Sequence, residues 1–112
     1  MQLTRYEVEV LKFMLQDRLT QHKWDEFLST CSISSYEFTG VGYFLEISCP
    51  KLFLEKETIH KPDILGKVDE IEVGFILFLE GNNITLECHT WGDGELPATV
   101  RDLNFQITQY NK

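Results

Sequence analysis

The first twenty residues alternate polar and apolar side chains with the period of an amphipathic helix. Thr4 followed three residues later by Glu7 is the sequence of a capping box, which marks a helix start. We therefore expect a helix over residues 4–19, with its apolar side packed against a core. The apolar positions recur every three or four residues, at Val8, Leu11, Leu15 and Leu19.

A second, shorter helical segment follows. It is expected to end near residues 29–32, where serine and threonine cluster and compete for backbone hydrogen bonds. Its apolar positions are again at helical spacing, at Trp24, Phe27, Leu28 and Cys31.

Beyond residue 32 the hydrophobic period changes from that of a helix to that of a strand. Residues 36–48 predict one long, bent strand, in which Gly40 and Gly42 mark a bulge or a close approach of another backbone. Residues 51–65 have no clean period and include Pro62, which predicts a long irregular connection.

Further strands are expected in the second half of the chain. Residues 74–79 are apolar on both faces, which is typical of a central strand covered on both sides. Glu80-Gly81-Asn82-Asn83 is rich in residues that tolerate turn conformations, and it predicts a hairpin to the next strand. The expected strands span residues 66–71, 74–79, 84–91 and 103–108.

Helices followed by strands predict an α+β fold, with N-terminal helices on one face of a mostly antiparallel sheet of four or five strands. The 112 residues suit one domain spanning residues 1–112. Helices cover only one face of a sheet, so the second apolar face of residues 74–79 needs another cover. Residues 51–65 or a second subunit in a homodimer are the two alternatives.

Composition and charge narrow the classes of partner. The formal net charge of −8 disfavours nucleic acid and anionic membranes, and it suits a basic protein partner. Residues 1–20 lack the uninterrupted apolar run of a signal peptide. The three cysteines are odd in number and widely spaced, which indicates reduced thiols and a cytoplasmic location.

The negative charge is concentrated between residues 63 and 97, where Lys67 is the only lysine or arginine. This segment is either a solvated acidic rim or a docking face for a basic partner. Its eight acids are Asp63, Asp69, Glu70, Glu72, Glu80, Glu87, Asp93 and Glu95. The candidate binding residues, where acids surround an aromatic anchor, are Glu87, His89, Trp91, Asp93 and Glu95.

Catalytic alternatives use the same segment. Glu87 and His89, two apart on a strand and about 7 Å from each other, could serve a small hydrolase or a metal-assisted enzyme. No nucleophile motif accompanies them, and Cys88 points to the opposite, apolar face. A metal site from His60, His89 and Asp93 has no supporting spacing, so no metal or cofactor is predicted.

Four short motifs stand out in the second half of the chain and just before it. They are EFTGVGYF at residues 37–44, GFILFL at 74–79, ITLE with its Leu-Glu pair at 84–87 and GELP at 94–97. In the order of these motifs the chain is similar to a family of small uncharacterised bacterial proteins over about residues 36–97, which excludes both predicted helices. The resemblance implies a bacterial, cytoplasmic, single-domain protein without an assigned activity.

Small acidic α+β proteins of this build are often immunity proteins, which neutralise a bacterial toxin by binding it. By that analogy alone, we expect a non-enzymatic acidic binding protein whose interface centres on Trp91. The alternative is the hydrolase or metal-assisted enzyme that uses Glu87 and His89.

Overall fold

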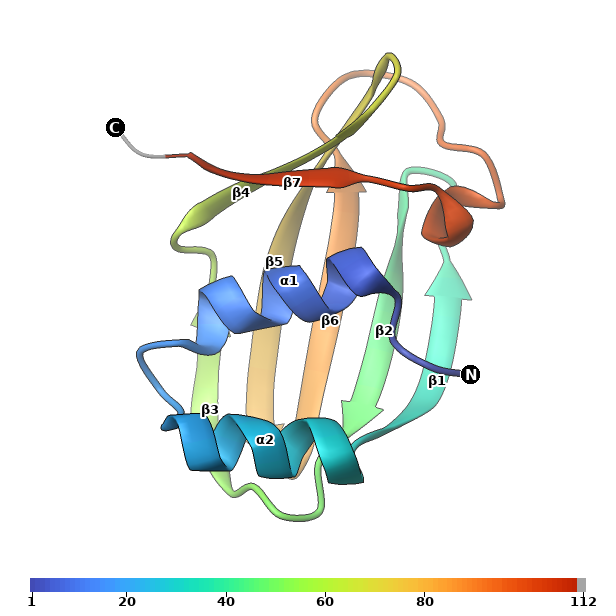
Figure 1. Cartoon of the computed structure of the whole chain (residues 1–112). Helices are drawn as coiled ribbons and strands as arrows, with labels where there is room; N and C mark the ends of the chain where they lie inside the picture. The colour runs from blue at the N-terminus through green and yellow to red at the C-terminus, as the bar shows by residue number, and fades with distance from the viewer. Residues whose placement is uncertain (111–112) are drawn as a thin grey trace.

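The computed structural model describes residues 1–110 and contains two helices and a seven-stranded antiparallel sheet (Figure 1). Both helices lie on the same face of the sheet and run across its strands. The predicted α+β class is therefore confirmed, whereas the predicted number of four or five strands is too low.

The first helix, α1 (Arg5–Leu15), begins at the predicted capping box. The Thr4 backbone N–H donates to Glu7 Oε1 over 2.9 Å, and the Glu7 N–H donates to Thr4 Oγ1 over 3.3 Å. The helix ends four residues earlier than predicted, in a turn over residues 16–19 where the backbone N–H groups of Arg18 and Leu19 both donate to the Leu15 carbonyl.

The second helix, α2 (Gln21–Thr30), follows after a short turn. Thr20 caps its N-terminus by accepting a hydrogen bond from the Lys23 N–H. Trp24 and Phe27 are buried on its inner face, as their spacing predicts.

The strands pair in the order β1-β2-β6-β5-β4-β7, and β3 also pairs with β5. All six pairings are antiparallel. The bounds are β1 (Ser32–Phe38), β2 (Gly42–Ser48), β3 (Leu54–Ile59), β4 (Asp63–Val68), β5 (Ile71–Gly81), β6 (Asn83–Thr90) and β7 (Gln106–Tyr110), with a short 3₁₀ helix η1 (Val100–Asp102) before β7.

The segment predicted as one bent strand over residues 36–48 is a hairpin of β1 and β2. The chain reverses at Gly40, whose φ of 91° favours glycine. The prediction for Gly42 is confirmed: a Cβ there would lie 1.8 Å from the Cys88 carbonyl oxygen on β6.

The prediction of an irregular connection over residues 51–65 is wrong. This segment forms β3, joined through Pro62 to β4, and both strands pair with the same edge of β5. The hydrophobic period is hidden because β3 is an edge strand, in which only Ile59 is buried.

Two other strand boundaries also differ from the prediction. The segment over residues 66–71 is interrupted by a turn at Asp69, whose φ is 51°, so β4 ends before it and β5 begins after it. The last strand, β7, begins at Gln106 because η1 precedes it and Leu103 still lies in the connection.

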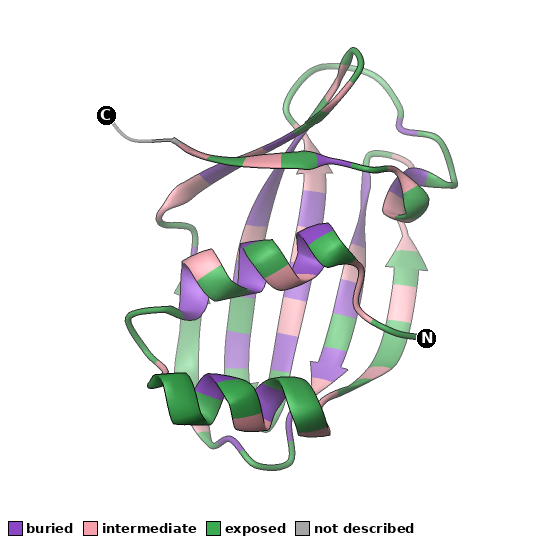
Figure 2. Ribbon diagram, viewed as in Figure 1, coloured by how far each residue is buried: buried purple, intermediate pink, exposed green. Residues whose placement is uncertain are grey.

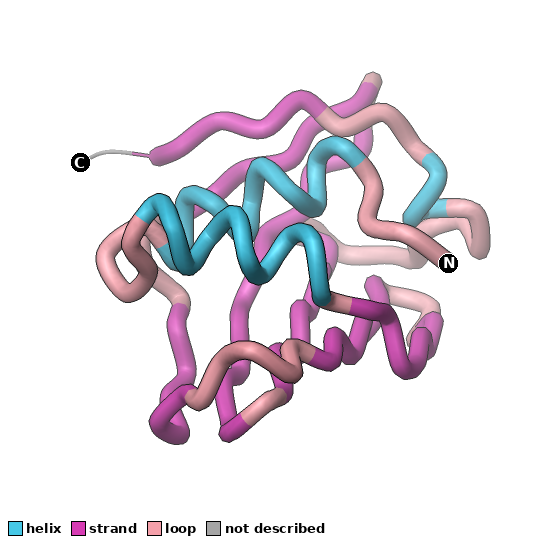
Figure 3. Tube along the Cα trace, turned by 60° about the horizontal axis from the view of Figure 1, so that its bottom comes forward, coloured by secondary structure: helices cyan, strands magenta, loops and turns pink. Residues whose placement is uncertain are grey.

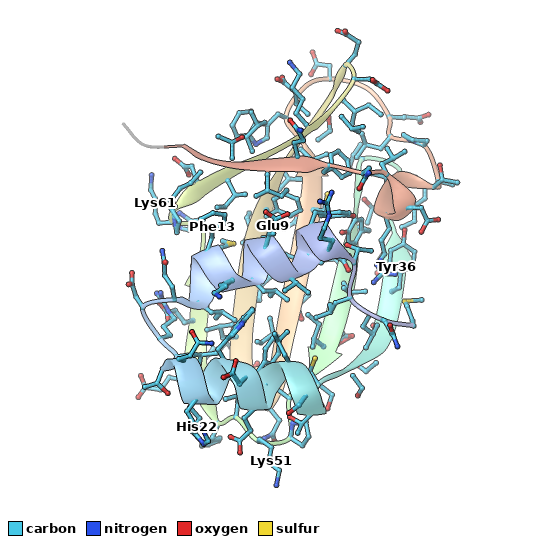
Figure 4. All side chains as sticks on the ribbon, in the orientation of Figure 1. Glu9, Phe13, His22, Tyr36, Lys51 and Lys61 are labelled. Carbon is cyan, nitrogen blue, oxygen red and sulfur yellow. The ribbon has the colours of Figure 1, made fainter. Side chains whose placement is uncertain are left out.

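Strands β4 and β7 bend away from the rest of the sheet and pass alongside α1 (Figures 1 and 3). Figure 4 shows Glu9 and Phe13 on the side of α1 that is turned toward β7. Phe105, just before β7, is fully buried and packs edge-on against Tyr6 of α1, with 5.1 Å between ring centroids. The first helix is thus enclosed by residues from the far end of the chain.

The core lies between the helices and the sheet, and burial alternates along each central strand (Figure 2). Inward positions such as Tyr43, Leu45, Leu77 and Leu86 are fully buried. We call the opposite side of β2, β5 and β6 the open face. Its central positions are half-buried or exposed, and they are Phe44, Glu46, Ile76, Phe78, Thr85, Glu87 and His89.

Candidate functional site

The predicted binding residues lie at the open face and the loop above it. Glu87 and His89 are both half-buried on the open side of β6. Glu87 stands between Phe44 on β2 and Ile76 on β5, to which it is directly paired. Strand alternation therefore identifies the correct face for both residues.

Trp91 follows directly after β6, and its backbone N–H donates to the Glu72 carbonyl over 3.0 Å. Its indole lies over Gly74 of β5, since a Cβ on Gly74 would be 2.2 Å from Trp91 Nε1 and 2.9 Å from His89 Cε1. The side chain is 42% exposed. Trp91 and His89 therefore sit together on the open face.

A small hollow opens beside this tryptophan, with a volume of about 160 Å³. Such a volume suits one side chain rather than a drug-sized molecule. Its lining includes the polar residues His60, Asp63 and His89, the aromatic residues Phe75 and Trp91, and Gly74 and Ile76 of β5.

Asp93 and Glu95 are exposed on the loop between β6 and η1. This loop is fixed to the β1–β2 turn by a hydrogen bond from the Leu96 N–H to the Gly40 carbonyl, 2.8 Å long. In Figure 1 the β4–β5 turn, which carries Asp69 and Glu70, lies at the same end of the sheet. The acids of two connections therefore gather at one end of the strands.

Two acids of the charged segment lie apart from this end. Glu80 is at the other end of β5, and Asp63 forms an ion pair with Lys61 at 3.2 Å. The acidic segment of the sequence is thus only partly one patch.

Charge is divided unequally between the two sides of the molecule. The helices carry side chains of both charges, and their cations include Arg5, Lys12 and Lys23. In contrast, β2, β5 and β6 contain no lysine or arginine. Their carboxylates are Glu46, Glu72, Glu80 and Glu87.

The same geometry gives little support to catalysis by these residues. His89 Nδ1 lies 3.4 Å from the Thr90 carbonyl, and no serine or thiol faces it in the hollow. Cys88 is buried on the opposite side of β6, where burial raises the pKa of its thiol. Within residues 1–110, no group of three or more His, Cys, Asp or Glu side chains could hold a metal ion.

A second polar cluster, which the sequence analysis does not predict, lies between α1, β2 and η1. Glu7 is fully buried, and Arg101 donates to it from Nε at 2.9 Å and from Nη2 at 2.8 Å. The Tyr43 hydroxyl donates to Glu7 Oε2 at 2.7 Å and shares a 2.8 Å hydrogen bond with the Tyr6 hydroxyl. These four residues form the Glu7 network.

The Glu7 network links α1, β2 and η1 through hydrogen bonds among its own members. Desolvation raises the pKa of Tyr43 and of Tyr6, so both hydroxyls stay protonated. The Arg101 guanidinium also lies 6.0 Å from the ring of Tyr36 on β1, which Figure 4 labels. Every buried polar side-chain atom of the described residues has a hydrogen-bond partner.

Comparison of the chain with protein-family models, with curated proteins and with solved structures gave no match. The resemblance through the EFTGVGYF and GFILFL motifs therefore stays a prediction. None of the helices in residues 1–110 has the length and apolar character that crossing a membrane requires.

Proposed function

We propose that this is a non-enzymatic binding protein that docks a basic protein partner on its open face. The site comprises Glu87, His89, Trp91, Asp93 and Glu95, which we call the Trp91 patch. The observation that carries the proposal is an aromatic side chain, 42% exposed, beside three strands that bear carboxylates and no lysine or arginine.

In protein interfaces, aromatic residues at the centre often supply most of the binding energy, and charged residues around them affect the rate of association. A partly exposed tryptophan offers a large apolar surface for burial, and such residues often supply most of the binding energy. Surrounding carboxylates steer a basic partner toward it and make association sensitive to salt. Two copies of the same acidic face would repel each other, which disfavours a homodimer through this surface.

A charge-reversal experiment tests the proposal. The partner is isolated on the immobilised protein from the native cell, identified by mass spectrometry and purified, and its binding is measured by surface plasmon resonance. Replacing Asp93 and Glu95 by lysine is expected to slow association about tenfold at low salt and to weaken its salt dependence. The control, Glu9→Lys with Asp17→Lys, makes the same charge change on the helix side.

Equal effects of the two double variants would overturn the assignment, because total charge and not the patch would then determine the rate. A partner whose association rate does not change with salt would overturn it as well.

A finer proposal follows from the resemblance and the analogy with immunity proteins. The protein would act in the bacterial cytoplasm, and its partner would be a bacterial toxin that it neutralises by direct binding. The isolated partner should then stop growth when it is produced alone and lose this effect when both proteins are produced together. A partner that is harmless when produced alone contradicts the immunity role.

The alternative is a small hydrolase or metal-assisted enzyme, favoured only by the common face of Glu87 and His89. Metal analysis of the purified protein, followed by thermal unfolding with added divalent ions, separates the two functions. Stoichiometric metal, or a large stabilisation by one ion, would favour the enzyme.

A further inference from the structure

We infer that the partner contacts the open face with an amphipathic helix that lies along β5, its apolar stripe flanked by lysine or arginine. This inference rests on the proposed function, because it specifies the partner of the same face. It extends the binding surface from the Trp91 patch to residues at the opposite end of β5.

The first observation is a line of apolar side chains along β5. Ile76 is half-buried and Phe78 is 38% exposed on the open face, and Trp91 covers the neighbouring position at Gly74. Every second residue of a strand points to the same side, so successive members of this line are about 7 Å apart. We call Trp91, Ile76 and Phe78 the β5 stripe.

The second observation is a hollow at each end of the β5 stripe. The hollow of about 160 Å³ lies beside Trp91 and Ile76. The other has a volume of about 360 Å³, and its lining includes Phe78, the carboxylates of Glu46, Glu57 and Glu80, and the single cation Lys56. On β5 the first hollow is lined by residues 74–76 and the second by residues 78–80, and the middles of these two segments are about four strand residues, or about 13 Å, apart. Two side chains seven or eight residues apart on one side of a helix span roughly 11–12 Å, so both hollows could be filled at once.

Backbone pairing favours a helix over an added strand at this position. β2, β6 and β5 are each paired on both sides, so their backbone groups are already satisfied within the sheet. An extended segment adds to a sheet at a free edge, whereas a face is covered by packing side chains, as α1 and α2 do on the opposite face.

Charge completes the description of the partner. Glu87 is directly paired with Ile76, and Glu46 lies two strands from Phe78 in the same row. Both carboxylates are on the β6 and β2 side of the β5 stripe, so the docked helix needs cationic side chains on that flank. A second copy of this chain would bring further carboxylates against them.

Designed peptides test this inference before the natural partner is identified. The probe is a blocked helical peptide of about 15 leucines and lysines, with the leucines at helical spacing. Its isomer has the same composition but alternates leucine and lysine, as an amphipathic strand does. Binding is measured at low salt by isothermal titration calorimetry, and peptide helicity by circular dichroism. We expect the helical peptide to bind about tenfold more tightly than its isomer.

Variants then locate the bound peptide. Phe78→Ser and Glu46→Lys should each weaken binding of the helical peptide about tenfold. Phe53→Ser, at a phenylalanine that is 87% exposed on the β2–β3 connection, should not change it. Because Glu46 is exposed, its variant remains informative if Phe78→Ser unfolds the chain.

Some results would contradict only the helical partner, and others would also contradict the proposed function. Equal affinity for the two isomers, or unchanged binding by both variants, would overturn the helix inference and leave the proposed function standing. Absence of binding by both peptides at low salt would contradict the inference and the proposal of a basic partner together. Dimerisation that Phe78→Ser abolishes would overturn the inference by showing that a second copy occupies the face.

Discussion

The ion pair between Glu7 and Arg101 joins the first helix to η1, and its removal should destabilise the whole fold. Glu7→Gln keeps the shape and the capping position of the side chain but removes its charge. Arg101→Met keeps an unbranched apolar stem but removes the guanidinium. The two single variants and the double variant together form a double-mutant cycle.

The burial of each partner sets the expected size of the effects. Arg101→Met leaves the Glu7 carboxylate, which is fully buried, with only Tyr43 and the Thr4 N–H as donors. We expect a loss of about 3 kcal/mol in the free energy of unfolding, because removing one partner strands a buried charge. Glu7→Gln should cost less, about 2 kcal/mol, since the Arg101 side chain is 12% exposed and can regain water.

The double variant should cost less than the sum of the singles by about 1–2 kcal/mol, because the second change removes the charge that the first one strands. Urea unfolding followed by circular dichroism measures all four proteins. If the single effects add to within about 0.5 kcal/mol, the two groups are not coupled and the reasoning is refuted.

Two other predictions concern a close backbone contact and the thiols. Gly42→Ala should cost about 3 kcal/mol or prevent folding, because its Cβ would overlap the Cys88 carbonyl, whereas Gly92→Ala, which meets nothing within 4 Å, should change the free energy of unfolding by less than about 0.5 kcal/mol. Thermal unfolding compares the two variants, and equal stability would contradict the steric argument. Burial raises the pKa of all three thiols, that of Cys49 to about 12, but Cys49 and Cys88 are buried whereas Cys31 is half-buried. Iodoacetamide at neutral pH should therefore label only Cys31 until urea is added. Mass spectrometry of the labelled peptides checks this result, and early labelling of either buried thiol would refute it.

Local sequence signals predict the parts of the fold that local interactions decide. The capping box at Thr4 and the turn around Gly81 form as predicted, because each needs only neighbouring residues. Strand β3 is missed because an edge strand of exposed, charged side chains leaves no hydrophobic period to detect. Its place in the sheet is decided by pairing with β5, about twenty residues further along the chain.

In the candidate site, too, features set by neighbouring residues are predicted and features set by distant residues are not. Alternation along β6 correctly places Glu87 and His89 on one face, away from Cys88. The position of Trp91 over Gly74 depends on the register between β5 and β6, which the sequence does not reveal. The Glu7 network joins residues 94 positions apart and leaves no local pattern.

The partnership of Glu7 with Arg101 has a consequence for how the protein is made. During synthesis α1 leaves the ribosome before η1, and the guanidinium that neutralises its buried carboxylate is added nearly a hundred residues later. Until Arg101 is present, burial of the unpaired Glu7 carboxylate is unfavourable, so we do not expect α1 to pack in its final position. We therefore expect the helix to dock on the sheet, and the sheet that carries the open face to become stable, only on a chain that has reached residue 101.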